Sequence, residues 1–99
     1  MTEYIVVYWK DVPSSVQAGE GDDAVRLPLS ARFQQLIDSV AMRQGLTSSV
    51  DYLAHWEKRH GGSRPGPPSE VAAQVVGELE AQFDEIRNQA LREIRTDDR

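Results

Sequence analysis

The amino-acid sequence predicts an α+β domain, in which a small antiparallel sheet packs against two or three helices and the chain has a long C-terminal helix. β-Branched and aromatic residues are concentrated near the start of the chain. Later apolar residues recur at steps of three or four, the period of a helix face. Strands followed by helices are typical of this class. The length of 99 residues predicts a single domain, residues 1–99, with one core.

Strands are predicted in the first part of the chain, residues 1–29. The clearest is Glu3 to Lys10, where almost every position is β-branched or aromatic. We expect Asp11 to Ser15 to end this strand and Ala24 to Leu29 to form a second one, with Val16 to Ala18 as a candidate extension of the sheet. Two strands alone are marginally stable in water, so helices or a second subunit must cover them.

Two helices are predicted in residues 30–60. Ser30 suits the N-cap of the first helix, and Gly45 suits its C-terminal stop. The apolar face of this helix consists of Phe33, Leu36, Ile37, Val40 and Ala41. Thr47 to Ser49 offer the cap of a shorter helix, Val50 to Arg59. Its inward-facing residues are expected to be Val50, Leu53 and Ala54, with Trp56 as a further candidate.

A loop and a long helix complete the predicted fold. Residues 61–68 are rich in proline and glycine, which predicts a loop. Residues 69–96 predict one helix, and at about 1.5 Å per residue its part from Glu70 to Arg95 would extend roughly 39 Å, beyond the ~30 Å that a small domain spans. An apolar stripe along this helix includes Val75, Leu79, Phe83, Ile86, Ala90 and Ile94.

This stripe supports two interpretations. Because the helix is expected to extend beyond the domain, the stripe is a candidate interface with another helix. Heptad spacing selects as interface residues Val76, Leu79, Phe83, Ile86 and Ala90. The heptad pattern lasts only about two repeats, however, which is short for a coiled coil. The alternative is that the stripe packs on the sheet of its own chain.

Composition and charge limit the expected partners and location. Eleven basic and sixteen acidic residues give a formal net charge of −5, which argues against a nucleic-acid ligand. No apolar run approaches the about eighteen residues of a membrane span, and Met1-Thr2-Glu3 lacks the basic start of a signal peptide. We therefore expect no membrane partner and no secretion by that route. The lack of cysteine fits a reducing compartment, and the predicted location is cytoplasmic.

The sequence predicts no catalytic residues, no metal site and no cofactor. His55 and His60 are five residues apart, about 140° around a helix, which does not match a two-histidine metal site. The serines lack the flanking glycines of a nucleophile elbow. The glycine pairs lack the spacing of a phosphate-binding loop. These observations favour a protein that is not an enzyme.

The polar end of the first strand is the strongest candidate for a ligand site. Trp9, Lys10 and Asp11 place an aromatic ring beside a cation and a carboxylate at a strand terminus. With Arg32 of the first helix, they would line a pocket between helix and sheet. Asp11 and Arg32 would hold a carboxylate or phosphate while Trp9 stacks on a ring. The alternative is that Trp9 is a core residue and that Lys10 and Asp11 are solvated.

The sequence also resembles a known family. The motifs that carry the resemblance are Tyr8-Trp9-Lys10-Asp11-Val12-Pro13, Leu29-Ser30-Ala31-Arg32-Phe33, Ile37-Asp38, Ala41-Met42, Tyr52-Leu53 and Trp56. Over about residues 4–56 these motifs are similar to the small bacterial family described as virulence factor, whose domain is also found at the end of conserved virulence factor C proteins. Lys10 stands where the family usually has arginine. The acidic turn from Gly19 to Asp23 replaces a basic turn of the relatives, which argues against anion binding at this turn.

Two functions are compatible with the sequence. The favoured one is a non-enzymatic interaction or accessory domain that acts through self-association or contact with another protein, because the apolar stripe is long and no catalytic set is recognisable. The alternative is a small-ligand-binding or catalytic domain that uses the polar corner. For this alternative the resemblance implies a link to one-carbon or folate metabolism, since relatives are often encoded near methylenetetrahydrofolate reductase-like proteins.

Overall fold

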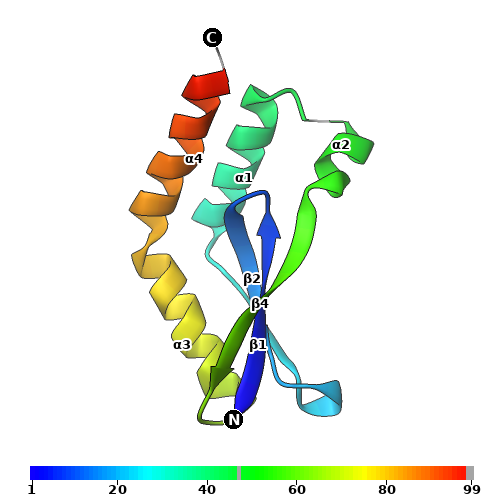
Figure 1. The fold of residues 1–99 in the computed structure, drawn as a ribbon, viewed down its shortest axis with the longest axis vertical. Coiled ribbons are helices and arrows are strands. Elements are labelled where there is room, and N and C mark those ends of the chain that lie inside the picture. Colours follow the sequence, from blue (N-terminus) through cyan, green and yellow to red (C-terminus); the bar gives the residue numbers. More distant parts are fainter. Residues whose placement is uncertain (47, 98–99) are drawn as a thin grey trace.

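The computed structural model describes residues 1–46 and 48–97 and confirms the α+β class (Figure 1). The described residues form four strands, four α-helices and one short 3-10 helix. In chain order these are β1 Thr2–Trp9, β2 Val12–Ala18, the 3-10 helix Gly21–Asp23, β3 Val25–Pro28, α1 Ala31–Arg43, α2 Ser49–Ala54, β4 Trp56–Arg64, α3 Pro68–Ala81 and α4 Phe83–Asp97. None of the described helices is long and apolar enough to cross a membrane.

The sheet has the strand order β3-β2-β1-β4, and all its pairs are antiparallel. β1 therefore lies in the interior of the sheet, with β2 on one side and β4 on the other. The backbone of β1 is hydrogen-bonded to a strand on each side. β-Branched and aromatic residues, which predict this strand, are favoured in such a position. β3 pairs with β2 and confirms the strand predicted near residues 24–29.

The hairpin between β1 and β2 is tighter than the sequence predicts. The sequence predicts that Asp11 to Ser15 end the first strand, and in the structure four of these residues, from Val12 on, already belong to β2. Lys10 adopts a left-handed backbone conformation with a φ of 54°, which lets the chain reverse over two residues. Pro13 lies next to an irregularity in the β1–β2 register, a place where a missing N–H donor is tolerated.

The prediction for residues 50–68 is wrong in part. The sequence predicts a helix to Arg59 and then a loop, whereas α2 ends at Ala54 and the following segment, Trp56–Arg64, is the strand β4. β4 pairs with β1 along the whole length of β1, and these backbone hydrogen bonds override the local helical pattern. Charged side chains along β4 are typical of an edge strand that is protected from pairing with other chains.

Two glycines predicted as loop formers lie inside β4. Gly61 lies directly against the Tyr4 ring, because a Cβ at this position would be 2.1 Å from Tyr4 Cε2. Gly62 has a φ of 135°, and the β1–β4 register shifts between Tyr4 and Ile5, which pair near these glycines. The glycines therefore allow a close approach and a bulge within the sheet.

The predicted long terminal helix is divided into two helices. The sequence predicts one helix for residues 69–96, whereas α3 and α4 are separated at Gln82. The Gln82 N–H is shared between the carbonyl oxygens of Glu78 and Leu79, an irregularity that lets the helix axis bend. As Figure 1 shows, α3 follows the sheet, while α4 turns to lie beside α1. The sheet that α3 covers and the side of α1 that α4 covers do not lie along one line. One straight helix would therefore not cover both.

The buried apolar residues form two clusters. The first lies around α1 and contains Trp9, Val12, Leu29, Phe33, Leu36, Ile37, Val40, Ala41 and Ala90. The second lies between α3 and the sheet and contains Val6, Val16, Ala18, Val71, Ala72 and Val75. Val76 and Leu79 pack against both clusters and connect them. All five residues predicted as the apolar face of the first helix are buried in α1, which confirms that prediction.

Candidate functional site

Trp9, the aromatic part of the predicted ligand site, lies in the core. Its side chain is fully buried. Its ring centroid is 5.5 Å from that of Tyr52 and 5.6 Å from that of His55. The indole Nε1 donates a hydrogen bond to the Tyr52 carbonyl oxygen at 2.7 Å, so its polar atom is also satisfied inside the protein. This geometry corresponds to the alternative interpretation, in which Trp9 is structural.

Lys10 and Asp11 form the hairpin turn and are held by neighbouring elements. The backbone N–H of Lys10 donates to the carbonyl oxygen of His55 at 3.0 Å. The Lys10 ammonium group donates to Oε1 of Gln44, which follows α1. The exposed Asp11 carboxylate accepts a hydrogen bond from Nη2 of Arg59 at 3.2 Å. These contacts attach the turn to β4 and to the end of α1.

Arg32, the fourth predicted ligand-site residue, binds the carboxylate of Glu80. Its Nε and Nη2 atoms lie 3.2 Å and 3.1 Å from Glu80 Oε1. The same carboxylate accepts hydrogen bonds from the Ser30 N–H at 2.6 Å and the Ser30 hydroxyl at 2.8 Å. Burial alone would raise the pKa of Glu80, but these hydrogen bonds favour the charged form and lower the pKa below its ordinary value. The carboxylate thus lies at the N-terminus of α1, where negative charge is favourable.

The four predicted ligand-site residues therefore have separate surroundings. Asp11 pairs with Arg59, and Arg32 pairs with Glu80, so the structure does not bring Asp11 and Arg32 together as an anion clamp in the described residues. Trp9 is covered by other aromatic side chains. Of the four, Arg32 is the one that lines a pocket between α1 and α4, which is a different place from the predicted pocket between α1 and the sheet.

The predicted interface stripe packs on the core of its own chain. Its members are Val76, Leu79, Phe83, Ile86 and Ala90. The first two contact both apolar clusters, and the next two contact the cluster around α1. The Phe83 ring meets the Phe33 ring edge to face, with centroids 5.0 Å apart, and Ala90 is buried. The other four members are half-buried. This packing corresponds to the second interpretation of the stripe, with the core around α1 as a further contact besides the sheet.

Exposed apolar side chains are found at the end of α1 and on α2. Met42 is 71% exposed, Val50 78% and Leu53 65%, and we refer to these three as the α1–α2 apolar surface. The sequence predicts Val50 and Leu53 to face inward, which is wrong. Tyr52 is the α2 residue that packs against the core, beside Trp9. In a helix of six residues the apolar pattern is too short to identify the buried face.

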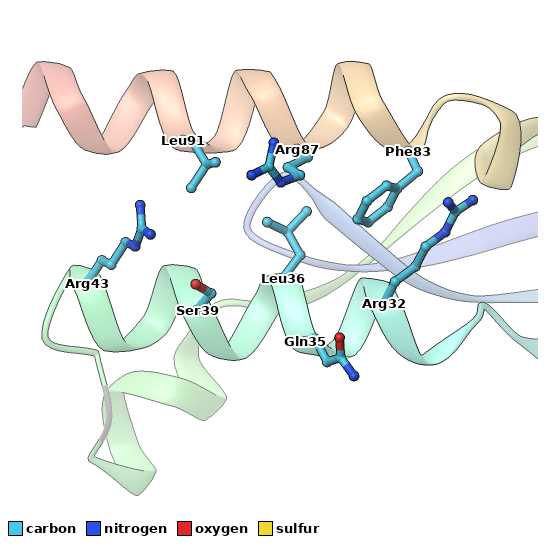
Figure 2. A pocket seen from close by; sticks show the side chains of 8 residues that line it. All are labelled: Arg32, Gln35, Leu36, Ser39, Arg43, Phe83, Arg87 and Leu91. Atoms are coloured by element: carbon cyan, nitrogen blue, oxygen red, sulfur yellow. The ribbon is translucent and has the colours of Figure 1, made fainter.

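A groove with a volume of about 350 Å³ lies between α1 and α4. Its lining residues are Arg32, Gln35, Leu36, Ser39 and Arg43 from α1, and Phe83, Arg87 and Leu91 from α4. Figure 2 shows Arg43 and Arg87 directed into the space between the two helices. The groove is not predictable from the sequence alone, because no local pattern indicates that α1 and α4 are neighbours. The available signal is the helical spacing that places Arg32, Ser39 and Arg43 on one face of α1.

The histidines do not assemble a metal site with the other described residues. Among these residues no group of three or more His, Asp or Glu side chains is arranged to hold a metal ion. His55 packs against the Trp9 ring. His60 lies on β4, and its Nε2 is 3.9 Å from the Glu3 carboxylate.

The fold and its surfaces thus define a small α+β domain with an exposed apolar surface and an arginine-lined groove between α1 and α4. Comparison of the chain with known families also identifies the family to which it belongs. A family model described as "Virulence factor" matches residues 7–91, most of the chain, so the protein belongs to the virulence factor family. This confirms the resemblance seen in the motifs of β1 and α1 and extends it through α3 into α4. No curated protein and no solved structure matches the chain.

Proposed function

We propose that this domain is a non-enzymatic interaction domain that associates with a second copy of itself, or with another protein, through the α1–α2 apolar surface. The observation that supports this proposal is the exposure of that surface. Four large apolar side chains are strongly exposed in the described part of the chain, and three of them are Met42, Val50 and Leu53. Exposed large apolar side chains that lie close together, as Val50 and Leu53 do three residues apart on α2, are typical of protein–protein contacts.

The way α2 is held leaves its outer face available. The Ser48 hydroxyl accepts a hydrogen bond from the Asp51 N–H at 3.2 Å and caps the helix. On the inner side, the Tyr52 ring packs between the Trp9 and Trp56 rings, with centroids 5.5 Å and 6.0 Å away. Val50 and Leu53 are three residues apart, which places them together on the opposite side. The helix is therefore fixed by its aromatic side and presents its aliphatic side to a partner.

This surface differs from the interface predicted from the sequence. The stripe on α3 and α4 has the core of its own chain as a partner, whereas the described structure contains no partner for Val50 and Leu53. Met42 adds a flexible side chain that adapts to different partner shapes. We further propose that the domain acts in the bacterial cytoplasm, a location that suits its cysteine-free sequence.

Light scattering over a dilution series tests self-association. We compare the intact chain with the double variant Val50→Glu/Leu53→Glu. The control is Gln74→Glu/Gln89→Glu, which adds the same charge at exposed positions of α3 and α4. The expected result is a concentration-dependent dimer for the intact chain and the control, and a folded monomer for Val50→Glu/Leu53→Glu.

A second experiment is decisive if all three proteins are monomers throughout the series. That result excludes the second copy and leaves another protein as the partner. A photo-crosslinking amino acid is then placed at Leu53 and, as a control, at the exposed Asp22 of the 3-10 helix. A discrete cross-linked protein in the native host at Leu53 but not at Asp22 supports the proposal. No cross-linked protein at Leu53 contradicts it.

A further inference from the structure

Two arginines of the α1–α4 groove have no carboxylate partner in the part of the chain that the structure describes. Arg32, Arg59 and Arg64 each form an ion pair with a carboxylate of the chain. Arg43 and Arg87 form no such ion pair within the described residues, although the protein carries more acidic than basic residues. Both guanidinium groups are directed into the groove (Figure 2). The groove therefore contains two arginines that no carboxylate of the described residues pairs with.

The acidic residue of α1 and the glutamate near the end of α3 are bound to other side chains. No Asp or Glu is among the described residues that line it. Asp38, the one acidic residue of α1, accepts a hydrogen bond from Nε2 of Gln34 at 3.0 Å. Glu80 is held by Ser30 and Arg32 at the other end of α1. The charge that would complement Arg43 and Arg87 is thus not supplied by the described chain, and an external anion would supply it.

We propose that the α1–α4 groove binds a small organic anion, a molecule with phosphate or carboxylate groups on an apolar body. The planar guanidinium groups of Arg43 and Arg87 match the oxygen geometry of both anionic groups. The Ser39 hydroxyl and the Gln35 amide line the same groove and provide further hydrogen-bond donors. The apolar body would contact Leu36, Phe83 and Leu91.

The shape of the groove favours a small molecule. Its volume of about 350 Å³ falls within the range of small-molecule sites, about 300 to 1,000 Å³. At one end the Arg32 guanidinium lies 4.4 Å from the Phe83 ring centroid and is neutralised by Glu80. The anionic group is therefore expected at the other end, near Arg43 and Arg87. This inference does not rest on the proposed protein interaction, because the groove and the α1–α2 apolar surface share no residue.

A titration followed by NMR tests the inference. Inorganic pyrophosphate and citrate are added in separate experiments, and the Nε–Hε resonances of the arginines are recorded. The test variant is Arg87→Gln. The matched control is Arg26→Gln, which removes the same charge from β3, outside the groove. We expect saturable shifts at Arg43 and Arg87, and binding that is weakened about tenfold or more by Arg87→Gln, the effect of losing a hydrogen bond to a charged group.

The outcomes separate a specific site from general charge attraction. Affinity that Arg26→Gln leaves unchanged and Arg87→Gln lowers supports the groove, provided that the backbone spectrum of Arg87→Gln overlays that of the unchanged protein. A response to pyrophosphate alone assigns the site to phosphate, and a response to citrate alone assigns it to carboxylate. The inference is overturned if neither anion shifts the Arg43 and Arg87 resonances, or if both variants weaken binding equally.

Discussion

Arg32 and Glu80 join the first turn of α1 to the last turn of α3, since Nη2 of Arg32 donates both to Glu80 Oε1 at 3.1 Å and to the Glu80 carbonyl oxygen at 2.8 Å. The same guanidinium lies over the ring of Phe83, the first residue of α4. One side chain thus contacts both helices on either side of the bend at Gln82. This contact adds to the packing of Phe83 and Ala90 on the cluster around α1, which holds α4 beside α1.

Removing the Glu80 charge is expected to weaken this junction. Glu80→Gln keeps the size of the side chain but replaces a carboxylate that accepts hydrogen bonds from Ser30 and Arg32 at the start of α1. The free energy of unfolding should fall by about 1–2 kcal/mol. Urea denaturation measures the change. Glu20→Gln, at an exposed position before the 3-10 helix, is the control and should change it by no more than about 0.5 kcal/mol. Equal effects of both variants would contradict the structural role of Glu80.

The stability of the protein should depend on pH through the same carboxylate. The pKa of Glu80 is lowered in the folded protein from an ordinary value of 4.5, so the folded state favours the charged form. The contribution of Glu80 to stability is fully present above the pKa that Glu80 has in the unfolded chain. It is lost as the pH falls through the lower pKa that Glu80 has in the folded protein. Denaturation curves below pH 4.5 should therefore show a shallower loss of stability for Glu80→Gln than for the unchanged protein. Parallel losses would show that other groups dominate.

The parts of the fold that the sequence predicts well are those with a local pattern. β1 is a continuous run of β-branched and aromatic residues, and α1 has five apolar residues on one face between a capping serine and a terminating glycine. β4 could not be predicted in this way. Its residues resemble a helix end and a glycine loop, and it is a strand because β1 supplies backbone partners that are distant in sequence. The division at Gln82 has the same origin, since α3 and α4 follow different neighbours.

The candidate site was less accessible to prediction than the fold. Arg32 is one of the predicted site residues, but its partner Glu80 is distant in sequence. Arg43 and Arg87 line one groove only because α1 and α4 lie side by side. Trp9 illustrates the opposite problem. A tryptophan beside charged residues is compatible with both a binding corner and a core position, and the contact with Tyr52 that distinguishes them is not visible in the sequence.

Two glycines should respond in opposite directions to replacement by alanine. In Gly61→Ala the new Cβ would lie 2.1 Å from Tyr4 Cε2, so the ring must move, and we expect a loss of about 1–3 kcal/mol in the free energy of unfolding. Gly77 lies inside α3, where a new Cβ would meet none of the described neighbouring atoms within 4 Å, so Gly77→Ala should add about 0.5–1 kcal/mol. Thermal denaturation compares the two variants. If Gly61→Ala is neutral, Tyr4 does not pack against β4 as described.

Phe83 and Leu53 provide the sharpest comparison between the core of the chain and its exposed apolar surface. Phe83 packs edge to face on Phe33 in the cluster around α1, so Phe83→Ala should lower the free energy of unfolding by about 2–4 kcal/mol. Leu53 is 65% exposed, and Leu53→Ala should change it by no more than about 0.5 kcal/mol in the monomer. Urea denaturation at a concentration where the protein is monomeric measures both. A Phe83→Ala variant that keeps full monomer stability but loses self-association would instead assign the stripe on α3 and α4 to an interface between chains.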